Sequence, residues 1–320
     1  MKLSTYNQTV REEVKPRFRG RKQLRSRARP IHPASLELEY RRLAGAYMVA
    51  LNKSIAEHLP ALHKAIVRER HGSRYDSDAD IRRLIDETFR AISSSFDRRV
   101  LTLGLERRLA NLANLSRNYR IREWKRIVRR TLGVNILEDY YRGDFFRHMM
   151  RTWTRDNVNL ITRVPQRTLS QMRDIIEDGY AEGRLMRDIG DEIRDAYGMG
   201  KRHAQNIARD QMAKLNADMT EAQHKDAGVE RFVWSTSTDE RVRESHVSFH
   251  GKQFSWSDPP MDYYSTKSRG NVPIGRTVPG RSIMCRCVAL PVFDIANLSL
   301  PWISQDAQAP VTRAIAAGST

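Results

Sequence analysis

Hydrophobic residues recur at helical spacing along much of the first 227 positions. Their steps of three to five residues match the period of an α-helix with one buried face. Further stripes of this kind run through residues 101–115, 116–133 and 169–193. The two clearest stripes consist of Leu38, Leu43, Tyr47, Leu51, Ile55 and Leu59, and of Ile81, Leu84, Ile85, Phe89 and Ile92. The pattern predicts that the N-terminal and middle regions are mainly helical.

Prolines, glycines and capping residues suggest where these helices break. We expect the first helix to end near Pro60, because proline lacks the backbone N–H that a helix needs. Ser116 is a candidate N-cap for a helix that closes at Gly133. Gly198 and Gly200 read most simply as the cap and turn between two packed helices.

The composition and the spacing of apolar residues change at Gly228. Val229, Phe232 and Trp234 are spaced like the apolar positions of a strand, and the following residues are rich in Gly, Pro, Ser and aromatics. The predicted fold is therefore mainly α in its N-terminal and middle regions, with a small α+β, loop-rich C-terminal domain. The expected divisions are a basic arm at 1–33, helical regions at 34–152 and 153–227, the C-terminal module at 228–300 and a tail at 301–320.

Positive charge is concentrated in two segments. The chain carries a net charge of +18. Residues 1–33 hold ten Lys/Arg against two acids, and residues 98–130 hold eleven against two, whereas the remainder is nearly balanced. Concentrated charge of one sign is typical of a surface that binds a polyanion. A solubilising tail and an ordinary solvated helix face are the alternatives.

The first basic segment mixes Pro, Gly and Arg, so we expect a disordered or extended arm that orders on a partner. A nucleic-acid contact through both segments would use arginines, which bind phosphate with two hydrogen bonds. The candidate contact residues are Arg17, Arg19, Arg21, Lys22, Arg25, Arg27 and Arg29 in the arm, and Arg122, Lys125, Arg126, Arg129 and Arg130 in the second segment.

Several protein classes are disfavoured by simple sequence features. The N-terminus lacks the apolar core of a secretory signal, and the longest apolar run, Leu43 to Leu51, is too short for a membrane span. Two cysteines separated by one residue do not form a disulfide framework, which indicates a reducing compartment.

Histidines and cysteines near the C-terminus are the candidates for chemistry. His246 and His250 are four residues apart, but Val247 stands where a zinc protease needs its glutamate. On a strand, Cys285 and Cys287 would face the same side. With His246, and with His250 or Asp239 as a fourth ligand, they can form a structural zinc site. Two ordinary buried thiols are the alternative.

An ordered series of residues in the C-terminal half resembles the minor head protein family named after protein F of phage Mu. The resemblance covers about residues 153–292. The matching positions are Trp234, Asp239, Arg241, Val242, Arg243, His246, Gly251, Pro279, Gly280, Cys285, Arg286, Cys287 and Pro291.

The resemblance implies a structural minor capsid protein of a tailed phage, not an enzyme. It further implies a location in the virion head near the portal vertex, after assembly in the host cytoplasm. The implied partners are portal and capsid proteins and double-stranded DNA, and the implied roles are head assembly, packaging or ejection.

Within the C-terminal module, we expect Trp234, Asp239, Arg241, Arg243 and Arg286 to form a buried or half-buried structural network, since clustered charges must be mutually paired. The alternatives are a zinc-dependent enzyme or toxin-like effector acting on nucleic acid or host protein, and a DNA-binding regulator.

Overall fold

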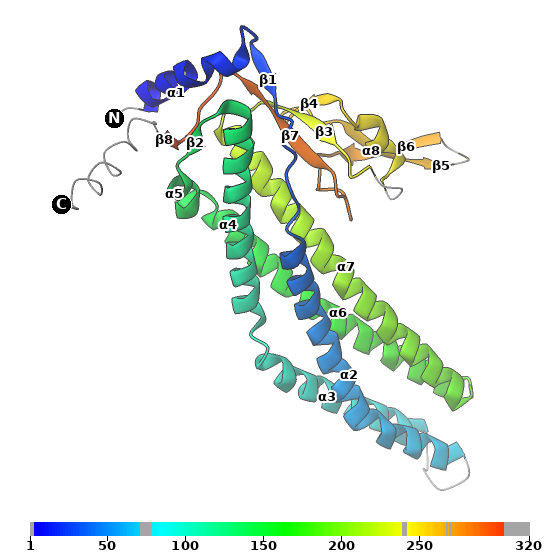
Figure 1. The fold of residues 1–320 in the computed structure, drawn as a ribbon. Coiled ribbons are helices and arrows are strands. Elements are labelled where there is room, and N and C mark those ends of the chain that lie inside the picture. Colours follow the sequence, from blue (N-terminus) through cyan, green and yellow to red (C-terminus); the bar gives the residue numbers. More distant parts are fainter. Residues whose placement is uncertain (1–2, 71–77, 239–241, 267, 269, 304–320) are drawn as a thin grey trace, which may run out of the picture. The chain divides into compact units, whose positions relative to one another are not determined.

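The computed structural model describes residues 3–70, 78–238, 242–266, 268 and 270–303 (Figure 1). The chain divides into two compact units. Ala34–Ala113 and Arg151–Gln211 form the first, here called the helical unit. Met1–Pro33, Asn114–Met150 and Met212–Thr320 form the second, here called the sheet unit. The predicted fold class, mainly helical with a small C-terminal region of sheets and a short helix, is confirmed.

The helical unit is built from long helices that bury the predicted hydrophobic stripes. It contains α2 (Ala34–Arg70) and α3 (Asp78–Leu101), with parts of α4 (Leu105–Leu132), α6 (Arg147–Ala181) and α7 (Met186–Asp226). Its core includes Leu43, Tyr47, Leu51, Ile81, Ile85 and Ile92.

A buried polar contact joins α2 to α6. The Tyr40 hydroxyl donates to Asn157 Oδ1 at 2.7 Å, and its ring meets Trp153 edge to face at a centroid distance of 5.6 Å. Because the tyrosine is fully buried, its hydroxyl needs this partner.

Two predicted helix breaks are wrong because packing overrides local preference. α2 continues through Pro60, and Leu62 and Ile66 beyond it are buried. A proline inside a helix costs about 3 kcal/mol, whereas burying two large aliphatic side chains stabilises by about 3–6 kcal/mol. Likewise α4 begins at Leu105 and runs through Ser116, whose side chain is buried.

The predicted turn at Gly198 and Gly200 is also wrong, since α7 runs unbroken through both. A Cβ atom at Gly200 would lie 2.4 Å from Thr168 Oγ1 on α6 and 3.0 Å from Met48 Cε on α2. Glycine at this position therefore allows three helices to approach closely, and it does not serve as a cap.

The sheet unit contains a four-stranded antiparallel sheet in the order β1-β7-β3-β4. These strands are β1 (Gln23–Arg25), β7 (Val288–Asp294), β3 (Arg231–Ser235) and β4 (Gln253–Ser255). The unit also includes α1 (Leu3–Phe18), the strand pair β2 (Asn135–Ile136) and β8 (Trp302–Ile303), α5 (Glu138–Tyr140), a π-helical turn at Tyr141–Phe145, α8 (Glu244–Phe249), and the hairpin of β5 (Met261–Thr266) and β6 (Gly270–Arg276).

Aromatic side chains and the two cysteines share one core in this unit. β3 is hydrogen-bonded on both sides, to β7 and to β4, which explains why it buries successive residues. The core cluster consists of Phe232, Trp234, Phe249, Trp256, Val278, Cys285, Cys287 and Ala289.

Residues 3–33 differ from the predicted disordered or extended arm, because they begin with a helix and include a paired strand. α1 buries Val10, Val14 and Phe18, which are spaced four residues apart and so share one helix face. β1 then pairs with β7, with Leu24 opposite Phe293. The prediction of disorder relied on the Arg, Gly and Pro content of this segment and overlooked the helical spacing of the three apolar residues.

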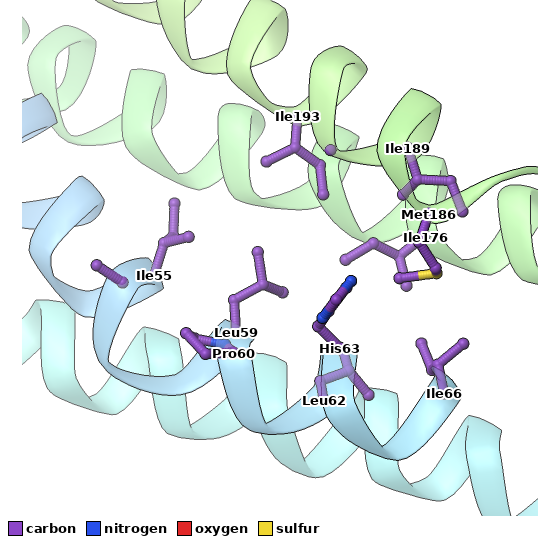
Figure 2. A pocket seen from close by; sticks show the side chains of 12 residues that line it. Ile55, Leu59, Pro60, Leu62, His63, Ile66, Ile176, Met186, Ile189 and Ile193 are labelled. Atoms are coloured by element: carbon purple, nitrogen blue, oxygen red, sulfur yellow. The ribbon is translucent and has the colours of Figure 1, made fainter. Parts of the chain in front are cut away.

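α2, α6 and α7 leave an apolar hollow of about 330 Å³ in the helical unit. Figure 2 shows side chains of the three helices around it, including Ile55, Ile176 and Ile189, with His63 among them. Gly190 belongs to the lining, and a Cβ atom there would meet no atom within 4 Å.

Two glycines of α7 should therefore respond oppositely to alanine. Gly190→Ala should raise the free energy of unfolding by about 0.5–1 kcal/mol, because helix propensity improves without a clash. Gly200→Ala should lower it by about 1–3 kcal/mol, since buried Thr168 must shift. Chemical denaturation followed by circular dichroism measures both. Changes of the same sign would contradict this account.

Candidate metal centre and arginine groove

The short helix α8 carries His246 into the core of the sheet unit. Ser245, His246 and Phe249 are buried on its inner side. The imidazole packs against the buried indole of Trp234 at a centroid distance of 4.9 Å. His246 is only 2% exposed, so its two ring nitrogens depend on protein partners.

Both cysteines face one nitrogen of this ring. His246 Nδ1 lies 3.5 Å from Cys285 Sγ and 3.6 Å from Cys287 Sγ. The β-like pattern around Cys285 and Cys287 predicted a strand, but both thiols lie in the segment that precedes β7. A turn directs them: the Cys285 N–H donates to Ser282 O at 2.9 Å, and Met284 adopts a φ of +58°, uncommon for a bulky residue.

Asp262 on β5 holds the other nitrogen. Its Oδ2 lies 3.3 Å from His246 Nε2, and it is 3% exposed. The same carboxylate accepts hydrogen bonds from Ser245 Oγ at 2.6 Å, from Ser282 Oγ at 3.1 Å and from the Tyr263 N–H at 3.0 Å. The result is a chain from carboxylate to imidazole to thiol.

Sequence reasoning missed Asp262. It is the one acidic residue between Pro259 and Phe293, in a stretch that carries several cations. A single acidic residue in a basic stretch does not by itself indicate a functional site. Its contact with His246 becomes evident only because α8 packs against β5.

The protonation states in this chain are coupled. Hydrogen bonding from Cys287 and the nearby His246 lower the pKa of Cys285 to about 4, against the opposing effect of burial. The hydrogen bond to Cys285, together with burial, raises the pKa of Cys287. Burial alone would lower the pKa of His246, but Cys285 and Asp262 outweigh it and raise that pKa. Burial likewise opposes the lowered pKa of Asp262, which hydrogen bonds from Ser245 and the charge of His246 produce.

This donor set can hold a metal ion. The ligand atoms of His246, Cys285 and Cys287 all lie within 4.8 Å of one another. Tetrahedral zinc, with Zn–S near 2.3 Å and Zn–N near 2.0 Å, places nitrogen and sulfur roughly 3.5 Å apart. The observed separations of 3.5 and 3.6 Å agree with that spacing. A carboxylate behind the ligating histidine is also the usual arrangement at metal sites.

The other predicted ligands lie elsewhere. His250 is exposed, and its Nδ1 accepts a hydrogen bond from the Thr236 N–H at 3.1 Å and lies 2.8 Å from the Thr236 hydroxyl. It is therefore engaged outside the group that can bind metal. Asp239 lies outside the described residues.

The predicted charged network also differs from the structure. Arg241, like Asp239, lies outside the described residues. Arg243 and Arg286 are exposed and not buried, and Arg243 donates to the Ile283 carbonyl at 2.8 Å. Only Trp234, among the described members, is buried. Buried polar contacts in this module instead converge on Asp262 and His246, because their partners face the core.

A second feature of the sheet unit is a hollow of about 1260 Å³, here called the arginine groove. Residues of α1, β1 and the end of α4 line it. No acidic residue is among the lining residues. Six of the lining residues are exposed arginines, namely Arg17, Arg19, Arg21, Arg25, Arg27 and Arg130.

The fold thus brings the two basic segments of the sequence to one place. Ser26 Oγ and Thr131 Oγ1 are 2.9 Å apart, which ties the segment after β1 to the end of α4. Lys22, Arg122 and Arg129 are exposed but do not line the groove.

Three other predicted contact residues have protein partners. Lys125 Nζ lies 2.6 Å from Glu138 Oε1. Arg126 binds Glu123 at 2.8 Å and the Arg29 carbonyl at 2.6 Å. Arg29 itself donates to the Thr236 carbonyl at 2.7 Å.

Comparisons with known proteins apply to the C-terminal half of the chain. Residues 170–290 match the family model described as Phage Mu protein F like protein. The chain is 35% identical over 141 residues to an uncharacterized protein of Haemophilus influenzae. That alignment covers 44% of this chain but 29% of the relative, so the chain spans less than a third of the relative's length. No solved structure matches the chain.

Within the described part of the chain, no helix is long and apolar enough to cross a membrane. His246, Asp262, Cys285 and Cys287 all lie inside the matched segment, whereas the six groove arginines precede it. Residues 170–290, which include the candidate metal centre, are therefore similar to the Phage Mu protein F-like family.

Proposed function

We propose that this protein is a structural minor capsid protein of a tailed phage that acts in head morphogenesis near the portal vertex. The match of residues 170–290 to the Phage Mu protein F-like family carries this proposal. Its partners are portal and capsid proteins and packaged double-stranded DNA. The protein assembles in the host cytoplasm, resides in the virion head, and assists assembly, packaging or ejection.

The arginine groove supports a contact with DNA. Six arginines line one hollow, and no acidic residue is among its lining residues. Guanidinium groups bind phosphate oxygens with paired hydrogen bonds. Because every DNA sequence presents the same phosphates, the binding is independent of sequence and weakens steeply as salt rises.

The candidate metal centre supports a structural role for zinc. A zinc ion held by His246, Cys285 and Cys287 would cross-link α8 to the segment before β7, and Asp262 would add β5 through the imidazole. A site of this kind stabilises a small domain directly.

The enzyme and effector alternatives are less well supported. An enzyme must present its reacting groups to a substrate, whereas His246 is only 2% exposed. Cys285 and Cys287, which are 6% and 5% exposed, lie in the lining of a hollow of about 250 Å³, but His246 does not. Such burial suits a structural centre.

Purified virions test the main proposal. If the protein is a minor capsid component, mass spectrometry should detect it in particles freed of host protein, at far fewer copies than the major capsid protein. Its absence from intact, infectious particles would refute the proposal.

Salt-dependent binding tests the groove. Arg25→Gln with Arg27→Gln should weaken binding to a random-sequence DNA duplex and reduce the salt slope of log K by about 2. Fluorescence anisotropy over a series of salt concentrations measures this slope. The matched control, Arg155→Gln with Arg187→Gln, removes two exposed arginines from the helical unit. If both double variants lose the same DNA affinity, the binding depends on the net charge of the protein and not on the arginine groove.

Elemental analysis tests zinc. Protein purified from zinc-supplemented cells should carry about one zinc per chain, and His246→Ala or Cys285→Ser should bring this below about 0.2. His250→Ala should leave the content unchanged, because that ring is bound to Thr236. Asp262→Asn should weaken zinc affinity about 10–100-fold. Metal-free wild-type protein would contradict the zinc site.

A further inference from the structure

A third hollow, of about 660 Å³, lies in the helical unit and is here called the α2–α7 groove. Its α2 side runs from Leu38 to Lys53, with lining residues in adjacent pairs four residues apart. This spacing marks one continuous helix face. The sixteen residues from Leu38 to Lys53, separated by fifteen rises of about 1.5 Å, extend about 22 Å. Lys201 and Gln205, one turn apart on α7, form part of the opposite side.

Neither backbone conformation nor close packing requires glycine at position 45 in this face. It lies inside α2 without a positive φ, and a Cβ atom there would meet nothing within 4 Å. Glycine inside a helix costs about 0.5–1 kcal/mol relative to alanine. Together with Ala46 and Ala50, it keeps the groove open and would let another backbone approach α2 closely.

The floor of the groove is apolar and accessible. Leu38 is 45% exposed and Val49 is 43% exposed, and Leu103 from the turn after α3 is half-buried beside them. On a helix face, such positions at repeated spacing are the contacts that a second helix fills.

The rim of the groove is positively charged. Arg41, Arg42, Lys53, Arg99 and Lys201 line it, and no acidic residue is among the lining residues. Arg99 is paired with Glu57 at 2.8 Å, and Arg42 lies 3.8 Å from Glu39, an exposed and weak pair. The occupant should therefore bring its own carboxylates.

We propose that the α2–α7 groove docks an amphipathic helix of another protein, with apolar residues on one side and flanking carboxylates. The apolar floor disfavours DNA, which offers phosphates and no apolar ridge. A second copy of this chain is disfavoured by its net charge of +18. The inference goes beyond the proposed function, because it assigns a protein-binding surface and the chemistry of its occupant, which that proposal leaves open.

A designed peptide provides the test. The probe is a fluorescent helical peptide of about 18 residues, long enough for the groove, with leucines along one face and glutamates beside them. Anisotropy should show saturable binding, and Gly45→Gln should weaken it about tenfold or more. Arg41→Glu with Lys53→Glu should weaken it similarly. Gly45→Gln should also raise the midpoint of thermal unfolding, because glutamine favours helix more than glycine does. Loss of binding in this variant therefore cannot reflect unfolding.

Gly198→Gln is the matched control. It places the same side chain inside α7, outside the groove, where a Cβ atom meets only the end of the Arg202 side chain at 3.6 Å. It should leave peptide binding unchanged. The proposal is overturned if the acidic peptide binds no better than a scrambled or lysine-bearing version, or if both glutamine variants lose binding equally. It is also overturned if Gly45→Gln reduces DNA binding or self-association and not peptide binding.

Discussion

The sheet unit depends on a histidine held in its core between a carboxylate and two thiols. Buried polar groups are costly unless each finds a partner, so this one chain of contacts dictates where α8, β5 and the segment before β7 must lie. The hydroxyls of Ser245 and Ser282 and the left-handed backbone of Met284 follow from it, since they satisfy Asp262 or aim the thiols. Trp234 closes the site by packing on the ring.

The basic residues fall into two groups, those that lie beside a carboxylate and those that line the arginine groove. Lys125 and Arg126 lie beside Glu138 and Glu123 and contribute to the fold around α4. The arginines of the groove face a shared hollow without a carboxylate in its lining. Like charges gathered in this way raise the local potential, which costs stability and favours an anionic partner. Net charge alone would not distinguish these two roles.

Glycines inside helices of the helical unit have three different physical meanings. Gly200 makes room for Thr168 and Met48, so it serves packing. Gly190 borders an apolar hollow that lies within one set of helices, and Gly45 borders a groove rimmed by cations. Glycine lowers helix stability at every interior position. Only the atoms around each position show whether its missing side chain allows close packing or leaves a hollow open.

The sequence by itself determined the helical character of the N-terminal and middle regions and the change of composition at Gly228. It also determined that His246, Cys285 and Cys287 are possible metal ligands. Periodicity and ligand chemistry are local properties, so they can be read from neighbouring residues. Local signals misled at Pro60 and Gly200, where contacts with other helices outweigh backbone preference.

Only the tertiary structure decided that Asp262 stands behind the imidazole, that His250, a predicted ligand, lies outside the metal-binding group, and that Arg130 joins Arg17 and Arg25 around one hollow. It also decided that β1 pairs with β7 and orders a segment whose composition suggests disorder. Each of these depends on how distant segments pair, and pairing across long stretches of chain is set by the packing of the whole core.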